Sequence, residues 1–145
     1  MKEWDENSNE INKIVKDKEK ATSLLKLIEL REKNIKNLEK EEFATLIVEG
    51  YYEIIKELIT AIMSVDGYKT LSHELLVGYI AKFYKEFSMF EINTIDQLRK
   101  TRNDIAYRGI IINMDYLERN EKPILKIIRA LKEKVKSKIK DDKWN

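Results

Sequence analysis

The chain has 145 residues, which is the size of one domain and too short for two well-filled cores. Charged residues make up 37% of it, with only four Gly and one Pro, so the composition favours long helices with few tight turns. The absence of Cys excludes disulfides and thiolate chemistry, and a net charge of +2 is too small to indicate nucleic-acid binding by itself. Since no apolar run approaches a membrane span and the N-terminus lacks a signal-peptide core, we expect a cytoplasmic protein without membrane contact.

Two helices are predicted in the first half of the chain. Residues 1–7 resemble a frayed end, and Ser8 is a cap for a helix towards Leu38, which the lysine-rich stretch 16–20 can break. The second helix is predicted from Glu41 to Val65, because apolar residues form a broad stripe along it. Its end is indicated by the pair Asp66-Gly67.

Two further helices are predicted in the second half. Ser72 is the N-cap of a third helix that ends near Phe87. After a linker, Thr94 caps a fourth helix that runs to Arg108, with Gly109 at its C-terminal end.

The last part of the chain predicts a connection and a final helix. The β-branched residues 110–112 are interpreted as a buried connection, because no second strand is evident to pair with them. Asn113 or Asp115 opens a helix to about Lys140 that Pro123 kinks or breaks. The sequence therefore predicts one all-α domain over residues 1–145, a mostly antiparallel bundle of four to five helices.

Lysines crowd the C-terminal end, from Lys132 to Lys143. We interpret them as a solvated last turn whose cations complement the helix dipole. A nucleic-acid contact is the alternative.

The fourth predicted helix carries an unusual number of polar residues. At about 100° per residue, Arg99, Asn103 and Tyr107 share one face. The core side of the same helix is marked by Ile95, Leu98 and Ile105. Arg102 falls within that core sector, so it is predicted to be the polar residue of this helix that is partly buried.

A partly buried guanidinium needs an anionic or carbonyl partner. The second helix offers Glu49, Glu53 and Glu57, spaced four residues apart beside its apolar stripe. One of them is expected to pair with Arg102 across the bundle. On physical grounds alone, an ion pair that sets helix register is the preferred interpretation, and an anion site is the alternative.

The pattern Leu98-Arg99-x-x-Arg102-Asn103-x-Ile105-x-Tyr107-x-Gly109, preceded by Gly67-Tyr68-Lys69-Thr70-x-Ser72-His73, resembles the HEPN superfamily of small helical domains. The similarity spans roughly residues 40–135. In that family, an Arg followed four to six residues later by His forms a metal-independent ribonuclease site at a homodimer interface. Many members are toxins encoded beside a minimal nucleotidyltransferase antitoxin, and others are inactive nucleotide-binding or scaffold modules.

The resemblance implies roles for individual residues. Arg102 matches the phosphate-binding Arg and Asn103 the polar residue after it, with Tyr107 in the place of the His. A phenol has a pKa near ~10 against ~6.5 for imidazole, so it is a poor general base and the usual cleavage is expected to be lost or slow. Arg99 and Arg108 are close enough in sequence to lower that pKa.

Other chemistry finds little support. One His and no Cys exclude the common zinc sites, and we expect neither a metal nor another cofactor. His73 is interpreted as a helix-terminal residue with local bonds, and a catalytic role requires it to meet Arg102 in space.

Three functions remain open. The preferred one is a dimeric HEPN-like protein that binds RNA or a nucleotide through Arg102, with Arg99, Asn103 and Arg108 beside it. In this reading ribonuclease activity is lost or weak, and membership of a toxin–antitoxin pair is one role that the resemblance implies. The alternatives are an active metal-independent endoribonuclease using Arg102 and Tyr107, and a structural helical homodimer.

Overall fold

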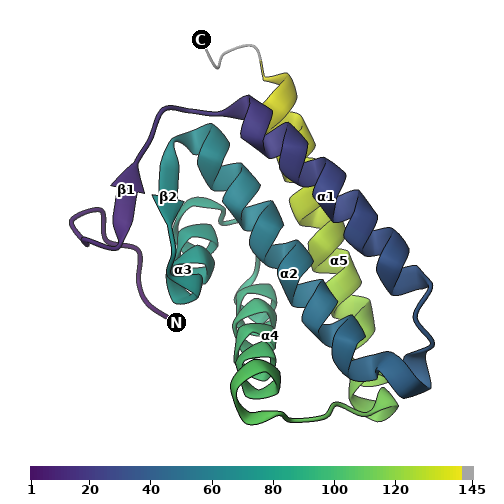
Figure 1. Ribbon diagram of the computed structural model, residues 1–145. Helices are drawn as coiled ribbons and strands as arrows, with labels where there is room; N and C mark the ends of the chain where they lie inside the picture. Colours follow the sequence, from purple (N-terminus) through teal and green to yellow (C-terminus); the bar gives the residue numbers. More distant parts are fainter. Residues whose placement is uncertain (142–145) are drawn as a thin grey trace.

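The computed structural model describes residues 1–141. Within this range it contains five helices and a small two-stranded sheet, which confirms the all-α prediction (Figure 1). In chain order the elements are β1 (Ile11–Lys13), α1 (Lys18–Lys36), α2 (Lys40–Asp66), β2 (Tyr68–Thr70), α3 (His73–Phe83), α4 (Met89–Arg108) and α5 (Met114–Lys140). The end of the predicted domain, including Lys143, lies outside the described residues.

The centre of the bundle is α2, which contacts each of the other four helices. α1 packs antiparallel against it, whereas α5 runs in the same direction as α2 (Figure 1). Most of α2 is buried because apolar residues cover more than one face of the helix. Its fully buried large side chains include Tyr52, Ile54, Ile55, Leu58, Ile59 and Ile62.

Several predicted helix ends are confirmed by their capping geometry. Gly67 and Gly109 end α2 and α4 in the left-handed region, with φ of 92° and 66°. Ser72 caps α3 by accepting a hydrogen bond from the Leu75 amide, and Asn113 caps α5 in the same way. The predicted break at Pro123 is wrong, because α5 continues through it as one helix from Met114 to Lys140.

The prediction was wrong about the start of α4. This helix begins at Met89, where the Ser88 hydroxyl accepts from the Glu91 amide and the Glu91 carboxylate accepts from the Ser88 amide. Thr94, the predicted cap, lies inside the helix and its hydroxyl donates to the Phe90 carbonyl. α3 ends at Phe83, earlier than predicted.

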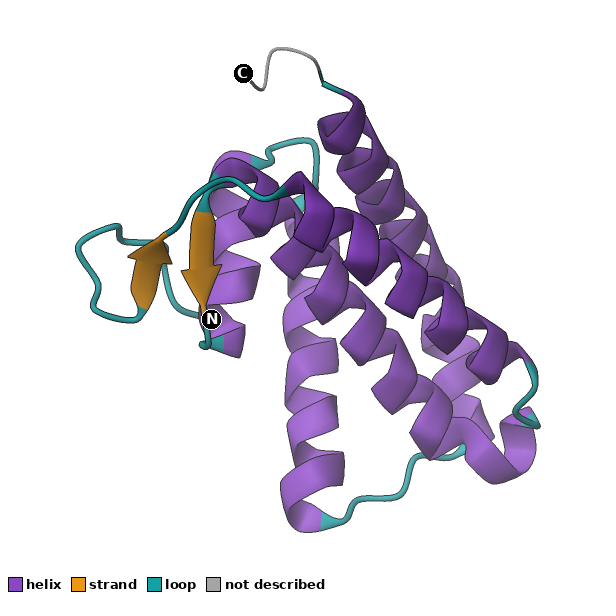
Figure 2. Ribbon diagram, turned by 45° about the horizontal axis from the view of Figure 1, so that its top comes forward, coloured by secondary structure: helices purple, strands orange, loops and turns teal. Residues whose placement is uncertain are grey.

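The N-terminal segment also differs from its prediction. Residues Ile11–Lys13 form β1 instead of helix and pair antiparallel with β2, with Ile11 opposite Thr70 (Figure 2). Residues 1–7 are not frayed, because the Trp4 side chain is only 5% exposed. Its ring packs against an aromatic cluster made of Tyr68, Tyr79 and Phe83.

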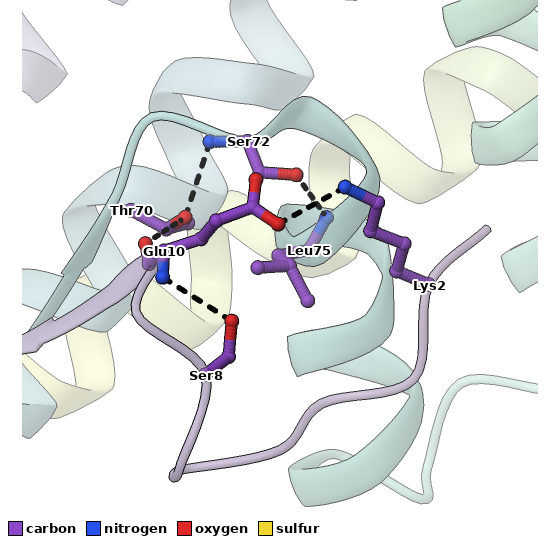
Figure 3. Close-up of polar contacts among 6 residues, drawn as sticks. All are labelled: Lys2, Ser8, Glu10, Thr70, Ser72 and Leu75. Atoms are coloured by element: carbon purple, nitrogen blue, oxygen red, sulfur yellow. Dashed lines mark hydrogen bonds and ion pairs between the residues drawn. The ribbon is translucent and has the colours of Figure 1, made fainter.

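Short polar contacts tie this segment to the start of α3 (Figure 3). The Thr70 hydroxyl donates to the Glu10 carbonyl at 2.8 Å and accepts from the Ser72 amide at 3.1 Å. The same Ser72 accepts from the Leu75 amide to cap the helix. β2 and the first turn of α3 therefore have a closely defined backbone.

Contrary to prediction, the connection between α4 and α5 is not a buried segment. Ile111 is 81% exposed, and Ile110 is 37% exposed. The connection is held by Thr45 of α2, whose hydroxyl accepts from the Ile112 amide and donates to its carbonyl.

Candidate anion-binding site

An open groove of about 570 Å³ lies between α1, α2 and α4, with Arg102 in its wall. Its lining comprises Arg31, Asn34, Ile35, Leu38, Leu46, Glu49, Gly50, Glu53 and Arg102. Two of the three glutamates predicted as partners of Arg102, Glu49 and Glu53, thus share this groove with it. Gly50 allows Ile35 of α1 to approach α2 closely, because a Cβ there would come within 2.9 Å of the Ile35 side chain.

Arg102 is only weakly paired in this groove. Its Nη2 lies 3.5 Å from Glu53 Oε1, which confirms the predicted ion pair between α2 and α4. The other oxygen of Glu53 holds the Lys56 ammonium at the shorter distance of 2.6 Å. The Nε of Arg102 is buried, and no residue of 1–141 accepts a hydrogen bond from it. A buried donor without an acceptor is costly, so this guanidinium is incompletely satisfied.

Glu57, the third candidate partner, pairs with a different arginine. Arg31 of α1 donates to its two oxygens at 2.7 Å and 3.1 Å. The hydrogen bond to Glu57, which is only 7% exposed, raises the pKa of Arg31 above its ordinary value. This bidentate pair joins α1 to α2, so Arg31 contributes less free charge to the groove than Arg102 does.

Arg99 is the most buried arginine of α4, at 8% exposure, which corrects the prediction that gave this place to Arg102. Its Nε donates to Asp96 at 3.0 Å one turn earlier on the same helix. Burial acts to raise the pKa of Asp96, but the Arg99 hydrogen bond and charge outweigh it and lower the pKa. Arg99 is thus a satisfied structural residue, and its predicted role in anion binding does not fit this geometry.

The remaining predicted residues lie towards the C-terminal end of α4. Asn103 is half-buried, whereas Tyr107 is 79% exposed. Arg108 is exposed and lies 3.5 Å from Asp104 on its own helix. Five residues along a helix correspond to about 140° of rotation, so Arg102 and Tyr107 of one chain point in different directions.

His73 opens α3 close to this site. Its ring centroid lies 5.8 Å from that of Tyr52. Burial lowers the pKa of His73, and the charges of Lys56 and Arg102 lower it further. The only histidine is therefore within electrostatic reach of Arg102, although no hydrogen bond joins the two in the described part of the chain.

Three of the five C-terminal lysines that the structure describes form ion pairs: Lys132, Lys134 and Lys138. Lys132 contacts Glu32 at 2.9 Å, and Lys138 contacts Asp66 at 2.6 Å. These ion pairs join α5 to α1 and to the C-terminal end of α2. The prediction that the C-terminal lysines form only a solvated last turn is therefore incomplete.

Metal chemistry finds no site here, since residues 1–141 contain no cluster of His, Cys, Asp and Glu that could hold a metal ion. Over the same residues, none of the helices has the length and apolar character that crossing a membrane requires. No protein-family model matches the chain, and neither a curated protein nor a solved structure matches it significantly.

Proposed function

We propose that the protein binds a phosphate-bearing ligand, RNA or a nucleotide, through Arg102. The observation that carries this proposal is the incomplete pairing of the guanidinium: within residues 1–141 it has one ion-pair contact, at 3.5 Å, and its buried Nε has no acceptor. A phosphate placed in the groove supplies acceptor oxygens that Glu53 does not. Asn103 is the next residue of the same helix, and its side chain is half-buried.

The proposed active form is a homodimer that meets at the C-terminal end of α4. Tyr107 and Ile111 are large side chains that are 79% and 81% exposed, with Ile110 between them. Apolar groups gathered at one end of the molecule favour association. The nucleotidyltransferase partner implied by the family resemblance stays a prediction, and co-expression of the two proteins tests it.

Binding is favoured over cleavage in this proposal. Cleavage needs an acid or base next to the phosphate held by Arg102, and Tyr107 of the same chain points elsewhere. An active ribonuclease therefore requires a second subunit to bring such a group into the groove. A wholly structural role is the other candidate, favoured by Glu49 and Glu53, whose negative charges lie in the same groove.

The proposal is tested with a labelled single-stranded RNA oligomer in EDTA. We expect binding by fluorescence anisotropy to weaken at least ~10-fold in Arg102→Gln. The matched control is Arg129→Gln, which removes an exposed arginine from α5 and is expected to bind normally. Equal weakening of RNA binding in both variants would mean that only the overall charge of the protein matters. RNA cleavage that is lost in Arg102→Gln would instead support the ribonuclease alternative.

A further inference from the structure

A second hollow, of about 250 Å³, lies where the start of α1, the middle of α2, β2 and the start of α3 meet. It shares no lining residue with the Arg102 groove. The lining consists of Lys20, Lys56, Thr60, Met63, Tyr68, Lys69, Thr70, Leu71, His73 and Leu76. None of these residues is acidic, which distinguishes this basic pocket from the groove.

The three lysines of the basic pocket come from three different elements. Lys20 lies in the first turn of α1, Lys56 in α2 and Lys69 in β2. Neither Lys20 nor Lys69 forms an ion pair with any residue of 1–141, and Lys56 pairs only with Glu53 outside the lining. Like charges brought together repel each other, so an anion bound among them lowers the electrostatic energy.

The pocket has a defined backbone on the side of β2 and α3. The Thr70 hydroxyl donates to the Glu10 carbonyl and accepts from the Ser72 amide (Figure 3). Thr70 directly follows Lys69 in the chain, and Ser72 directly precedes His73. α3 begins at His73, so the positive end of its helix dipole adds to the field of the lysines. This preorganisation reduces the conformational entropy that the protein loses when an anion binds.

We propose that the basic pocket binds a phosphate dianion, either inorganic phosphate or the terminal phosphate of a monoester. Lys20, Lys56 and Lys69 supply the ammonium donors, and His73 supplies a ring N–H. A monoester phosphate carries about −1.5 to −2 charge near neutral pH and three strong acceptor oxygens, so it matches three cations better than a singly charged carboxylate does. The site does not include Arg102, so this proposal can be tested independently of the proposed function.

His73 gives this site its own spectroscopic probe, because it is the only histidine. Burial and the charge of Lys56 lower its pKa. A bound dianion offsets the repulsion from the lysines, and the pKa of His73 then rises towards its ordinary value.

The experiment is a titration of the full chain with inorganic phosphate, followed by the NMR signal of the His73 ring at constant ionic strength. In the wild type we expect a saturable shift and a rise in the His73 pKa. In Lys20→Gln/Lys69→Gln the affinity is expected to fall at least tenfold. The matched control is Lys26→Gln/Lys33→Gln, which removes two exposed lysines of α1 and is expected to bind phosphate normally.

Further arms identify the source of the phosphate and separate the two sites. Arg102→Gln is expected to retain the His73 response, and RNA with a 5′-phosphate is expected to produce it whereas RNA with a 5′-hydroxyl does not. An RNA response without any response to inorganic phosphate or a nucleoside monophosphate would overturn the proposal. A linear wild-type response, equal loss in both double variants, or loss in Arg102→Gln alone would also overturn it.

Discussion

Arg99 and Arg102 lie one helical turn apart on α4, and they differ in how completely their charges are paired. Arg99 is buried and donates to Asp96 at 3.0 Å, whereas Arg102 reaches Glu53 only at 3.5 Å. Asp96 depends mainly on Arg99, but Glu53 already holds Lys56 at 2.6 Å. We therefore assign Arg99 to the stability of the fold and Arg102 to ligand binding.

The first prediction concerns the stability of the two arginine variants. Arg99→Gln is expected to lower the free energy of unfolding by about 2 kcal/mol, because it leaves a buried carboxylate without its main partner. Arg102→Gln is expected to cost less than ~1 kcal/mol, because its ion pair is long and Glu53 keeps Lys56. Urea unfolding of both variants measures the difference, and a larger loss in Arg102→Gln would reverse the assignment.

The second prediction concerns His73 and pH. Burial and the neighbouring Lys56 and Arg102 lower the pKa of His73 in the folded chain. Between that value and the unfolded pKa near ~6.5 the unfolded chain binds more protons, so stability falls as the pH drops through this window. The fall is expected to be smaller in His73→Gln, as measured by urea unfolding at pH 7.5 and at lower pH.

A related change tests the distance between the two sites. Arg102→Gln removes a positive charge that acts on the imidazole, so it is expected to raise the His73 pKa in an NMR titration. Arg129→Gln serves as the control. An unchanged His73 pKa in Arg102→Gln would mean that the charge of Arg102 does not act on the His73 ring.

Local signals predicted most helix ends, and long-range contacts explain the errors. Ser72, Gly109 and Asn113 acted as caps because capping depends on neighbouring residues alone. β1 was missed because its partner β2 lies more than 50 residues away in the chain. The capping box of Ser88 and Glu91 was present in the sequence, and it outweighs Thr94 because it satisfies two backbone donors.

The third prediction concerns the N-terminal segment. A Cβ on Gly78 would lie 2.2 Å from the Lys2 carbonyl oxygen, so Gly78→Ala is expected to displace the segment and expose Trp4. In a Trp144→Phe background, tryptophan emission should shift to longer wavelength. Gly50→Ala is the control, because its Cβ meets only the tip of a flexible Ile35 side chain. An unchanged spectrum in Gly78→Ala would contradict the docked arrangement.

The fourth prediction concerns the proposed dimer. Ile111→Asp places a charge in the exposed connection that follows α4 and is expected to shift the protein from dimer to monomer in light scattering. Leu30→Asp changes an apolar residue that is 63% exposed on α1, and it should leave the dimer intact. A wild-type monomer at micromolar concentration would contradict the dimer itself.

The sequence predicted the partner of Arg102, but it did not predict which arginine of α4 is the most buried. Helical spacing placed Arg102 opposite the glutamates of α2, and Glu53 is indeed its partner. The angular positions of residues around one helix do not show that Asp96 accepts a hydrogen bond from Arg99. That bond allows Arg99 to be buried. The basic pocket was missed because its lysines come from separate elements that only the folded chain brings together.

The most direct test of the central claim is the RNA affinity of Glu53→Gln compared with that of Arg102→Gln at the same salt concentration. If Arg102 is available to an anion and Glu53 competes for it, Glu53→Gln binds RNA more tightly than the wild type and Arg102→Gln binds it at least ~10-fold more weakly. If the Arg102–Glu53 ion pair only sets the register of α2 and α4, two outcomes are expected. Both variants keep the wild-type affinity for RNA, or both bind RNA more weakly because they lose the fold. That result would contradict ligand binding by Arg102.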